Sequence, residues 1–496
     1  MDVITSTATA IILNNPHTLW ILIVGFVLAF ILGAGMGGND VANAFGTSVG
    51  SKVVTIIQAY MLATVFETAG AMLVGSFVVD TMRKGVVDTT LYDQEQQLFM
   101  LGQLAILGGC AAWLMIATVM QMPVSTTHSI VGATIGFSIV CKGLEGIRWI
   151  EIGKIVSSWF LSPALSGFLS SSLYLIVDHT VLRKPNALES GYIALPIFYA
   201  VCVGVNAFMV VYQGSPALHF DKIPWYAAIL ISVLIGLLTG FAVHFLAIPR
   251  IRRKIRDSHS TSSGTRSNSD GELVNESTVE KRVAAWESLE GTKTMPALTM
   301  PGRPASEEPR TGLSWLLPRP GQIEETAVLE LFKYIQLFTA CFAGFAHGAN
   351  DVSNAIAPLS ALWAIWNKGN QEAPVDWWIV LYGVAAICVG LWLLGHRVIK
   401  TVGTEMSEIN PASGFTIEFG AAMAALIASK LGLPISTTHC LVGSVVCVGY
   451  LRSRENVDWR IFRNIAVSWV VTLPVAGLIG AGIMFLLKTV ALDKPS

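Results

Sequence analysis

Two short motifs whose side chains can bind ions each occur twice in the chain. The first motif carries amides and a carboxylate, and the second carries hydroxyls and an imidazole. The four copies are GGNDVANA at 37–44, GANDVSNA at 348–355, PVSTTHSIVG at 123–132 and PISTTHCLVG at 434–443. Asp351 follows Asp40 by 311 residues, and His439 follows His128 by the same 311 residues. One constant offset shared by two different motifs indicates an internal duplication.

Each copy of the first motif predicts a set of oxygen ligands. Asn39 and Asn43 are four residues apart and share one face of a helix, and the second copy repeats this spacing. The glycines of LGAGMGGND predict a weakened helix whose backbone carbonyls turn toward a cavity. Carboxylate, amide and carbonyl oxygens suit Na⁺ or a proton-carrying site, although an NDxxN pattern can also join helices by hydrogen bonds. A charged aspartate inside an apolar span is costly, so a matched pair favours function. The predicted cation ligands are Asn39, Asp40, Asn350 and Asp351.

Each copy of the second motif predicts the start of a helix that can face an anion. Pro123 ends the incoming helix, and Ser125 is a good N-cap for the next one. A helix N-terminus presents unpaired N–H groups and partial positive charge, which suit an anion without a buried lysine or arginine. Ordinary capping is the alternative for one copy alone, and the repetition favours two N-termini aimed at one anion. The predicted anion ligands are Ser125, Thr126, Thr127, Ser436, Thr437 and Thr438, together with Asn43 and Asn354.

Four further ionisable residues are candidates for ion coupling or gating. Glu67 and Glu418 lie in apolar runs but are not a matched pair, because the position 311 residues after Glu67 is Trp378. Both glutamates are predicted to couple or gate, with simple hydrogen bonding inside the bundle as the alternative. His128 and His439 either relay protons or hydrogen-bond to the backbone in the first helical turn. A fifth candidate, His347, receives little weight because its counterpart, position 36, is Met.

The composition indicates the setting in which these residues work. The chain has 496 residues, of which 53% are hydrophobic and 13% charged, with a mean hydropathy of +0.60. Soluble domains carry roughly a quarter charged residues, so this chain lacks the charge for a water-facing surface. The net charge of −1 excludes a strongly basic nucleic-acid binder and an acidic disordered chain. The chain is therefore predicted to be an all-α polytopic membrane protein.

The order of apolar runs predicts two membrane halves joined by a polar linker. Runs long enough to span occur at about 17–35, 53–79, 98–120, 152–177, 191–212, 224–248, 327–345, 376–395, 414–430 and 460–488, with shorter ones at 129–141 and 440–450. The segment between the halves is rich in Ser, Thr, Gly, Pro and charge without periodicity, which predicts a disordered linker. The predicted domains are an N-terminal half at 1–248, which is one repeat plus two extra helices, the linker at 249–325 and a C-terminal half at 326–496.

The count of crossings predicts that the two repeats are inverted. If each short STTH run counts as one crossing, seven crossings precede the linker and five follow it, giving about twelve. An odd number of crossings separates equivalent points, so the copies point in opposite directions, with short half-helices at the PxSTTH motifs. Basic residues are concentrated at 250–256 and 452–463. The positive-inside rule therefore predicts a cytoplasmic linker and external termini.

The paired motifs GxNDxxNA and P[VI]STTH around a long hydrophilic linker resemble the inorganic phosphate transporter (PiT) family. The resemblance covers both membrane halves and implies Na⁺-coupled phosphate import at the plasma membrane. It implies that the segments of Asp40 and Asp351 supply cation ligands, and that the segments of Ser125 and Ser436 hold phosphate between them. By the same resemblance, Glu67 and Glu418 look like intramembrane glutamates that the family needs for transport.

The predicted function is therefore a sodium-coupled phosphate symporter that works by alternating access and is not an enzyme. Its predicted partners are inorganic phosphate, Na⁺ and the lipid bilayer, with no nucleic acid, no cofactor and no metal beyond the transported Na⁺; a homodimer is left open. One alternative is a transporter of the same fold that uses H⁺ or carries another oxyanion such as sulfate. A less favoured alternative is an intramembrane phosphatase using Ser125 with His128, or Ser436 with His439. An enzyme needs one asymmetric catalytic set, whereas here both halves keep every candidate.

Overall fold

The computed structural model describes residues 15–75, 79, 83, 87–212, 220–264, 313–319, 324–370, 373–430 and 435–491. These residues are almost entirely helical, and their extended pairing is limited to two isolated bridges, Val87 with Ile147 and Ser407 with Val457. Two compact units are present: residues 1–246 with 318–496, called here the membrane unit, and residues 247–317. The all-α prediction is confirmed.

Ten segments of the described chain are long and apolar enough to cross a membrane. Their main helices are α2 (Leu19–Gly50), α3 (Ile56–Gly70), α5 (Gln96–Val119), α7 (Trp149–Val177), α8 (Ala187–Val211), α9 (Trp225–Ala242), α13 (Thr326–Lys368), α14 (Trp377–Leu394), α16 (Pro411–Lys430) and α18 (Trp459–Ala491). Two shorter helices begin inside the STTH motifs: α6 (Thr126–Lys142) and α17 (Thr437–Arg452). Together these make twelve segments in the described residues, seven before the linker and five after it, as the sequence predicts.

Shorter elements complete the described chain. Single 3-10 turns are η1 (Pro16–Thr18), η3 (Thr89–Tyr92) and η6 (Phe220–Lys222), and π-helical turns are η2 (Ala71–Gly75), η4 (Asp178–Leu182), η7 (Val243–Ala247) and η8 (Thr401–Glu405). The remaining α-helices are α10 (Ile248–Gly264), α12 (Leu313–Leu316) and α15 (His396–Lys400). Each π turn continues directly from an α-helix and lengthens it by about one turn: η2 follows α3, η4 follows α7, η7 follows α9 and η8 follows α15.

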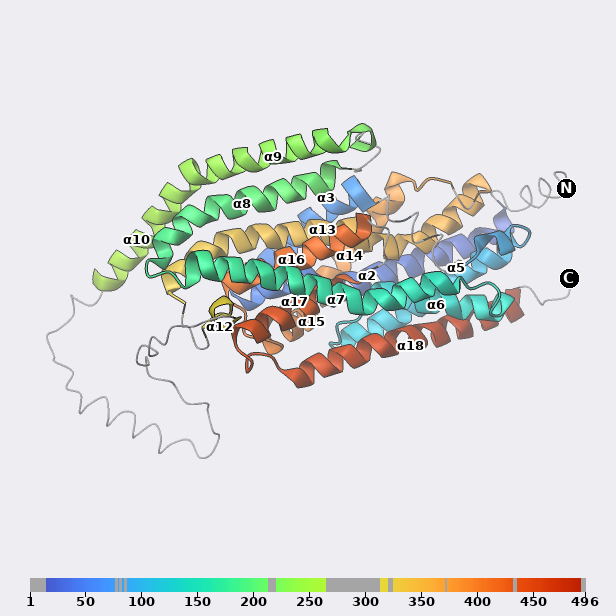
Figure 1. Cartoon of the computed structure of the whole chain (residues 1–496). Coiled ribbons are helices and arrows are strands. Elements are labelled where there is room, and N and C mark those ends of the chain that lie inside the picture. Colours follow the sequence, from blue (N-terminus) through green and yellow to red (C-terminus); the bar gives the residue numbers. More distant parts are fainter. Residues whose placement is uncertain are drawn as a thin grey trace, which may run out of the picture. The chain divides into compact units, whose positions relative to one another are not determined.

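The two copies of the repeat run in opposite directions within the membrane unit. Helix α2 begins at the end of this unit where α18 finishes, whereas α13 begins at the opposite end (Figure 1). Helices α6 and α17 likewise start in the interior and run toward opposite ends of the unit (Figure 1). Helix α7 follows the end of α6, and α18 follows the end of α17. This is the inverted arrangement that the crossing count predicts.

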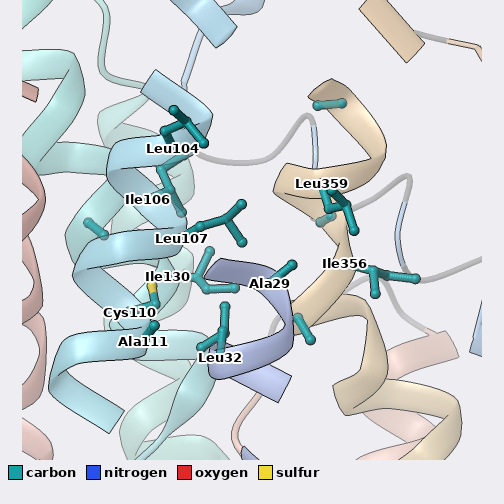
Figure 2. Packing of buried hydrophobic residues seen from close by; sticks show 14 of the residues in the cluster. Ala29, Leu32, Leu104, Ile106, Leu107, Cys110, Ala111, Ile130, Ile356 and Leu359 are labelled. Atoms are coloured by element: carbon teal, nitrogen blue, oxygen red, sulfur yellow. The ribbon is translucent and has the colours of Figure 1, made fainter. Parts of the chain in front are cut away.

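Apolar packing among α2, α5, α6 and α13 forms the core that holds the repeats together. Figure 2 shows Leu32, Leu107, Ile130 and Leu359 from these four helices lying close to one another. All four side chains are buried. Lipid tails are as apolar as leucine, so burying apolar side chains between helices in a bilayer contributes little binding free energy by itself. Close side-chain packing must therefore supply much of the association between these helices.

The glycines of the first motif pack helices together and leave the helix intact. Helix α2 is continuous through residues 33–38, so the predicted weakening of the helix is wrong. A Cβ atom at Gly37 would lie 1.8 Å from the carbonyl oxygen of Ile387 on α14. Small residues allow two helix backbones to approach this closely, and the contact explains the glycines better than a freed carbonyl does.

The predicted linker begins with regular structure. Helix α10 covers Ile248–Gly264, and Ile248, Ile251 and Ile255 form a buried stripe on it while arginines occupy other positions. The prediction of disorder is therefore wrong for residues 249–264, because their apolar residues recur at helical spacing between the basic ones. Residues 265–312 and 320–323 of the predicted linker lie outside the described residues.

Candidate functional site

Both STTH motifs cap a helix in the same way. The hydroxyl oxygen of Ser125 accepts a hydrogen bond from the backbone N–H of His128 at 3.3 Å, and that of Ser436 accepts from the backbone N–H of His439 at 3.3 Å. Both serines have extended backbone, so each is the N-cap that the sequence predicts. Their hydroxyls are therefore occupied as acceptors and remain available as donors.

The two capped N-termini contact each other in the interior of the membrane unit. The Thr127 hydroxyl donates to the carbonyl oxygen of Ile435 at 3.4 Å, and the Thr438 hydroxyl donates to the carbonyl oxygen of Val124 at 3.4 Å. Each first turn therefore bonds to the residue just before the other cap. The structure brings together two helix ends that are 311 residues apart in the sequence, with their positive ends facing a common region.

Each aspartate of the first motif bonds to the half-helix of its own repeat. The Thr126 hydroxyl donates to Oδ2 of Asp40 at 2.8 Å, and the Thr437 hydroxyl donates to Oδ2 of Asp351 at 2.9 Å. Both carboxylates are 2% exposed. Two buried carboxylates therefore lie at the positive ends of two helices, where a cation and an anion can be bound next to one another.

The asparagines of the first motif cross from one repeat to the other. Nδ2 of Asn43 donates to the Thr438 hydroxyl at 2.9 Å, and Nδ2 of Asn354 donates to the Thr127 hydroxyl at 3.3 Å. The same nitrogens also lie 3.3 Å from Oδ1 of Asp40 and 3.1 Å from Oδ1 of Asp351. Both amides therefore connect the carboxylate of one repeat to the hydroxyls of the other. Six of the eight predicted anion ligands, the four threonines and two asparagines, form one hydrogen-bonded cluster with both aspartates, while the two serines cap the adjoining helices.

The two remaining predicted cation ligands occupy different surroundings. Nδ2 of Asn39 donates to the carbonyl oxygen of Met122 at 2.9 Å, and its Oδ1 accepts from the backbone N–H of Val124 at 3.1 Å. This side chain therefore holds the turn that precedes the Ser125 cap. Asn350 is half-buried, and its backbone carbonyl accepts from the Ser353 hydroxyl at 2.6 Å.

Glu418 lies in a ring of hydroxyl and amide donors from both repeats. Its Oε1 accepts from Thr47 and Ser48 of α2 at 2.6 Å each, and from Nε2 of Gln336 at 3.2 Å. Its Oε2 accepts from the Thr339 hydroxyl of α13 at 2.7 Å. The glutamate is buried, so these donors replace water around a carboxylate that joins α16 to α2 and α13.

Glu67 is paired with a histidine to which the sequence reasoning gives little weight. Nδ1 of His347 lies 3.3 Å from Oε1 of Glu67, and Nε2 of the same ring lies 3.4 Å from Oδ2 of Asp351. One imidazole therefore links the coupling candidate on α3 to the aspartate of the second motif. A Cβ at Gly348 would lie 2.1 Å from the carbonyl oxygen of Glu67, so this glycine allows the close approach of α3 and α13.

Reasoning from the repeat alone gives His347 little weight because the first copy has Met at the equivalent position 36. Two signals in the sequence point to it: it is an ionisable residue inside an apolar run, and it stands four residues before Asp351. On a helix that spacing places both side chains on one face. An ionisable residue at membrane depth is by default a functional candidate, with or without a symmetry mate.

The histidines of the STTH motifs pack against aromatic rings. The His128 and His439 rings are 4.7 Å apart between centroids. His128 lies 4.5 Å from the Trp159 ring, and His439 stacks on Trp469 at 3.7 Å. All four belong to the repeated sequence. These contacts place the two imidazoles side by side where the two half-helices meet.

The geometry is that of a buried polar cluster built from two inverted copies, and comparison with known proteins gives the family of the chain. A model described as the phosphate transporter family matches residues 36–480. The chain belongs to this family. The matched range contains both copies of both motifs, so the cluster lies inside the part of the chain that the family shares.

Individual members of the phosphate transporter family match over almost the whole chain. Sodium-dependent phosphate transporter 1-A of Danio rerio is 37% identical, with 97% of this chain and 96% of the relative covered. Sodium-dependent phosphate transporter 1 of Homo sapiens is 35% identical, with 99% of each covered. A solved structure described as the sodium-dependent phosphate transporter is 30% identical, with a TM-score of 0.74 over 95% of this chain and 99% of that one.

Proposed function

We propose that this protein is a sodium-coupled symporter of inorganic phosphate and that the cluster at the α6 and α17 N-termini is its transport site. The observation that carries the proposal is the mutual contact of the two half-helix N-termini, with a buried aspartate bonded to each. The names of the relatives, which are sodium-dependent phosphate transporters, support phosphate and Na⁺ as the transported ions.

The anion is held by donors that need no lysine or arginine. The Ser125 and Ser436 hydroxyls remain available as donors, and the N–H groups of the first turns add further donors at two positive helix ends. The hydroxyls of Thr126, Thr127, Thr437 and Thr438 each donate their one hydrogen within the protein in this structure, and they donate to the anion when it replaces those partners. The amides of Asn43 and Asn354 lie on the same cluster and supply donors from the opposite repeat. Phosphate carries oxygens in several directions, so it suits donors that converge from two sides.

The cations reduce the negative charge that phosphate would otherwise meet. Asp40 and Asp351 are bonded to the first-turn threonines, so an empty site holds carboxylates where the anion must bind. Na⁺ bound at these carboxylates offsets their charge, and phosphate affinity then depends on Na⁺. The difference in binding free energy between outward-facing and inward-facing states drives the transport cycle.

The proposed orientation places the chain termini outside the cell and the linker in the cytoplasm, in the plasma membrane. It is supported by the basic residues of α10, by Arg454 in the connection between α17 and α18, and by Arg460 in the first turn of α18. The connection between α17 and α18 lies at the end of the membrane unit opposite to the start of α2 and the finish of α18 (Figure 1).

Phosphate uptake into proteoliposomes tests the function directly. Purified full-length protein is reconstituted, and radiolabelled phosphate uptake is measured under an imposed inward Na⁺ gradient, an H⁺ gradient, or neither. We expect concentrative uptake with the Na⁺ gradient alone. Equal uptake under H⁺ without Na⁺ would replace sodium by protons as the driving ion, and phosphate-ester hydrolysis without uptake would refute the transporter.

Two observations bear on the alternatives. The imidazole of His347 between Glu67 and Asp351 supplies a place for a proton, so proton coupling is the second candidate. The phosphatase is disfavoured because Ser125 bonds to the backbone N–H of His128, while the His128 ring packs on Trp159. A nucleophilic serine requires the imidazole itself within hydrogen-bond reach.

A further inference from the structure

An apolar cavity lies between α8 and α13, away from the N-termini of α6 and α17. It has a volume of about 580 Å³, is partly open, and is lined by residues of α3, α8, α9, α13 and η6. This volume falls within the range of about 300–1,000 Å³ typical of small-molecule sites. Seven of its fifteen lining residues are aromatic, among them Phe66, Tyr199, Phe338 and Phe342. The walls therefore suit a rigid apolar body.

One polar side chain in the wall lacks a partner. Asn206 of α8 lines the cavity and is 7% exposed, yet neither its Nδ2 nor its Oδ1 has a hydrogen-bond partner among the described residues. A buried amide without a partner is unfavourable, so such a group in a native structure needs an explanation. Of the described residues in the wall, Asn206 alone carries an amide or a charge. The missing partner must therefore come from whatever fills the cavity.

The chemistry of Asn206 defines the polar group of that occupant. The amide offers N–H donors and a carbonyl acceptor, and both kinds of atom are unpaired. A hydroxyl donates and accepts at once and can pair with both. An ester carbonyl of a phospholipid only accepts, so it would leave Oδ1 of Asn206 unpaired.

The depth of Asn206 agrees with a hydroxyl near the lipid headgroups. Asn206 is five residues before Val211, the last residue of α8, and a rise of 1.5 Å per residue places it roughly 7–8 Å from the helix end. Successive helices alternate in direction, so this end of α8 is the one where α2 begins. The polar head of an amphiphile would thus be near the membrane surface, with its apolar body deeper, against the Tyr199 and Phe338 rings, which pack on each other with centroids 5.6 Å apart.

We propose that this cavity is a binding site for a membrane sterol, whose hydroxyl pairs with the side-chain amide of Asn206. The sterol's fused rings contact the aromatic wall of α13 and α3. Phe345 and Phe66 both line the cavity, and they stand two residues before His347 and one residue before Glu67. An occupant therefore contacts the two helices that carry the Glu67–His347–Asp351 cluster.

Binding of tritiated cholesterol to the purified full-length protein in detergent tests the proposal. We expect saturable binding to the wild type, binding weakened at least about tenfold in Asn206→Leu, and loss of binding in Val203→Trp, which fills the cavity. Val205→Trp is the matched control: it lies two residues away on α8 and lines a separate groove against α9, so its binding should equal that of the wild type.

A chemical variant of the ligand tests the hydrogen bond without any mutation. Cholesterol methyl ether cannot donate, so we expect it to bind the wild type as weakly as cholesterol binds Asn206→Leu. The proposal is overturned if wild-type binding is not saturable, if Val203→Trp binds like the wild type, or if the ether binds as well as cholesterol. Native mass spectrometry that finds a phospholipid retained by the wild type and lost in Val203→Trp would also overturn it, by assigning the cavity to an acyl chain.

Discussion

The surroundings of Asp40 and Asp351 are alike on one side and different on the other. Both carboxylates accept from the first-turn threonine of their own repeat, and both lie beside an asparagine that reaches into the other repeat. Among the described residues, an imidazole nitrogen lies within ion-pair distance of Asp351, at 3.4 Å, but not of Asp40, because position 36 is Met where position 347 is His. The features shared by both copies form the hydroxyl cluster, so the duplication preserves this cluster, and the difference between the copies lies beside Asp351.

The two intramembrane glutamates also differ in the groups that surround them. Glu418 is surrounded by neutral donors from α2 and α13, which satisfy a carboxylate without an ion. Glu67 instead contacts the ring of His347. A group held by many fixed donors is suited to structural support, whereas a group sharing one titratable partner is suited to changes of charge during transport. We therefore expect the two glutamates to differ in their mutant phenotypes.

The largest effect is expected when either aspartate loses its charge. Asp40→Asn and Asp351→Asn should each abolish sodium-dependent phosphate uptake, because a neutral amide cannot balance the positive charge of Na⁺. Surface expression, measured by biotinylation, should stay normal. Asp→Glu at the same positions is the control that keeps the charge. Uptake at the wild-type level in either asparagine variant would show that the two aspartates are not equivalent and would remove that one from the coupling site.

The second largest effect is expected at the residue that distinguishes the two copies. His347→Gln should lower uptake roughly tenfold and change its dependence on Na⁺ concentration, because Glu67 and Asp351 lose the ring that lies between them. Met36→Leu, at the equivalent position of the first copy, should stay within about twofold of the wild type. An unchanged Na⁺ dependence in His347→Gln would mean that the asymmetry has no role in coupling. Initial uptake rates over a series of Na⁺ concentrations provide the measurement.

A smaller and symmetrical effect is expected from the threonines. Thr126→Val and Thr437→Val should each raise the apparent phosphate constant roughly five- to tenfold, since each removes one hydrogen bond that involves a charged group. The two increases should agree within about twofold. Ser125→Ala combined with Thr126→Ala should raise the constant further. A constant that stays at the wild-type value would show that the helix N-terminus is only a cap.

The smallest effect is expected in the donor ring of Glu418. Thr339→Val removes one of its four donors and should lower the free energy of unfolding by about 1–3 kcal/mol, with no change in the apparent phosphate constant. Thr339→Ser keeps the hydroxyl and should recover most of the loss. Thermal unfolding in detergent measures stability, and uptake measures the constant. A changed phosphate constant at normal stability would place Glu418 in the transport site.

The sequence was sufficient for the architecture and for most of the cluster. Membrane helices form from long apolar segments because the bilayer leaves no other way to satisfy the backbone, so composition and run length predict them directly. The constant offset between motif copies predicts the duplication, and the odd number of crossings predicts its inversion. Serine before a helix predicts the cap at Ser125 because capping depends only on residues within one turn.

Tertiary structure alone decided which residues from distant helices meet. The bonds of Asn43 to Thr438 and of Asn354 to Thr127 depend on how the repeats interlock, and nothing near these residues in the sequence specifies the partner. The contact of Glu67 with His347 depends on the close approach of two helices at Gly348, which no local pattern reveals. Local forces fix helices and caps within a few residues, whereas long-range contacts follow from packing the whole bundle. For that reason the cluster of Glu67, His347 and Asp351 became visible only in the folded chain.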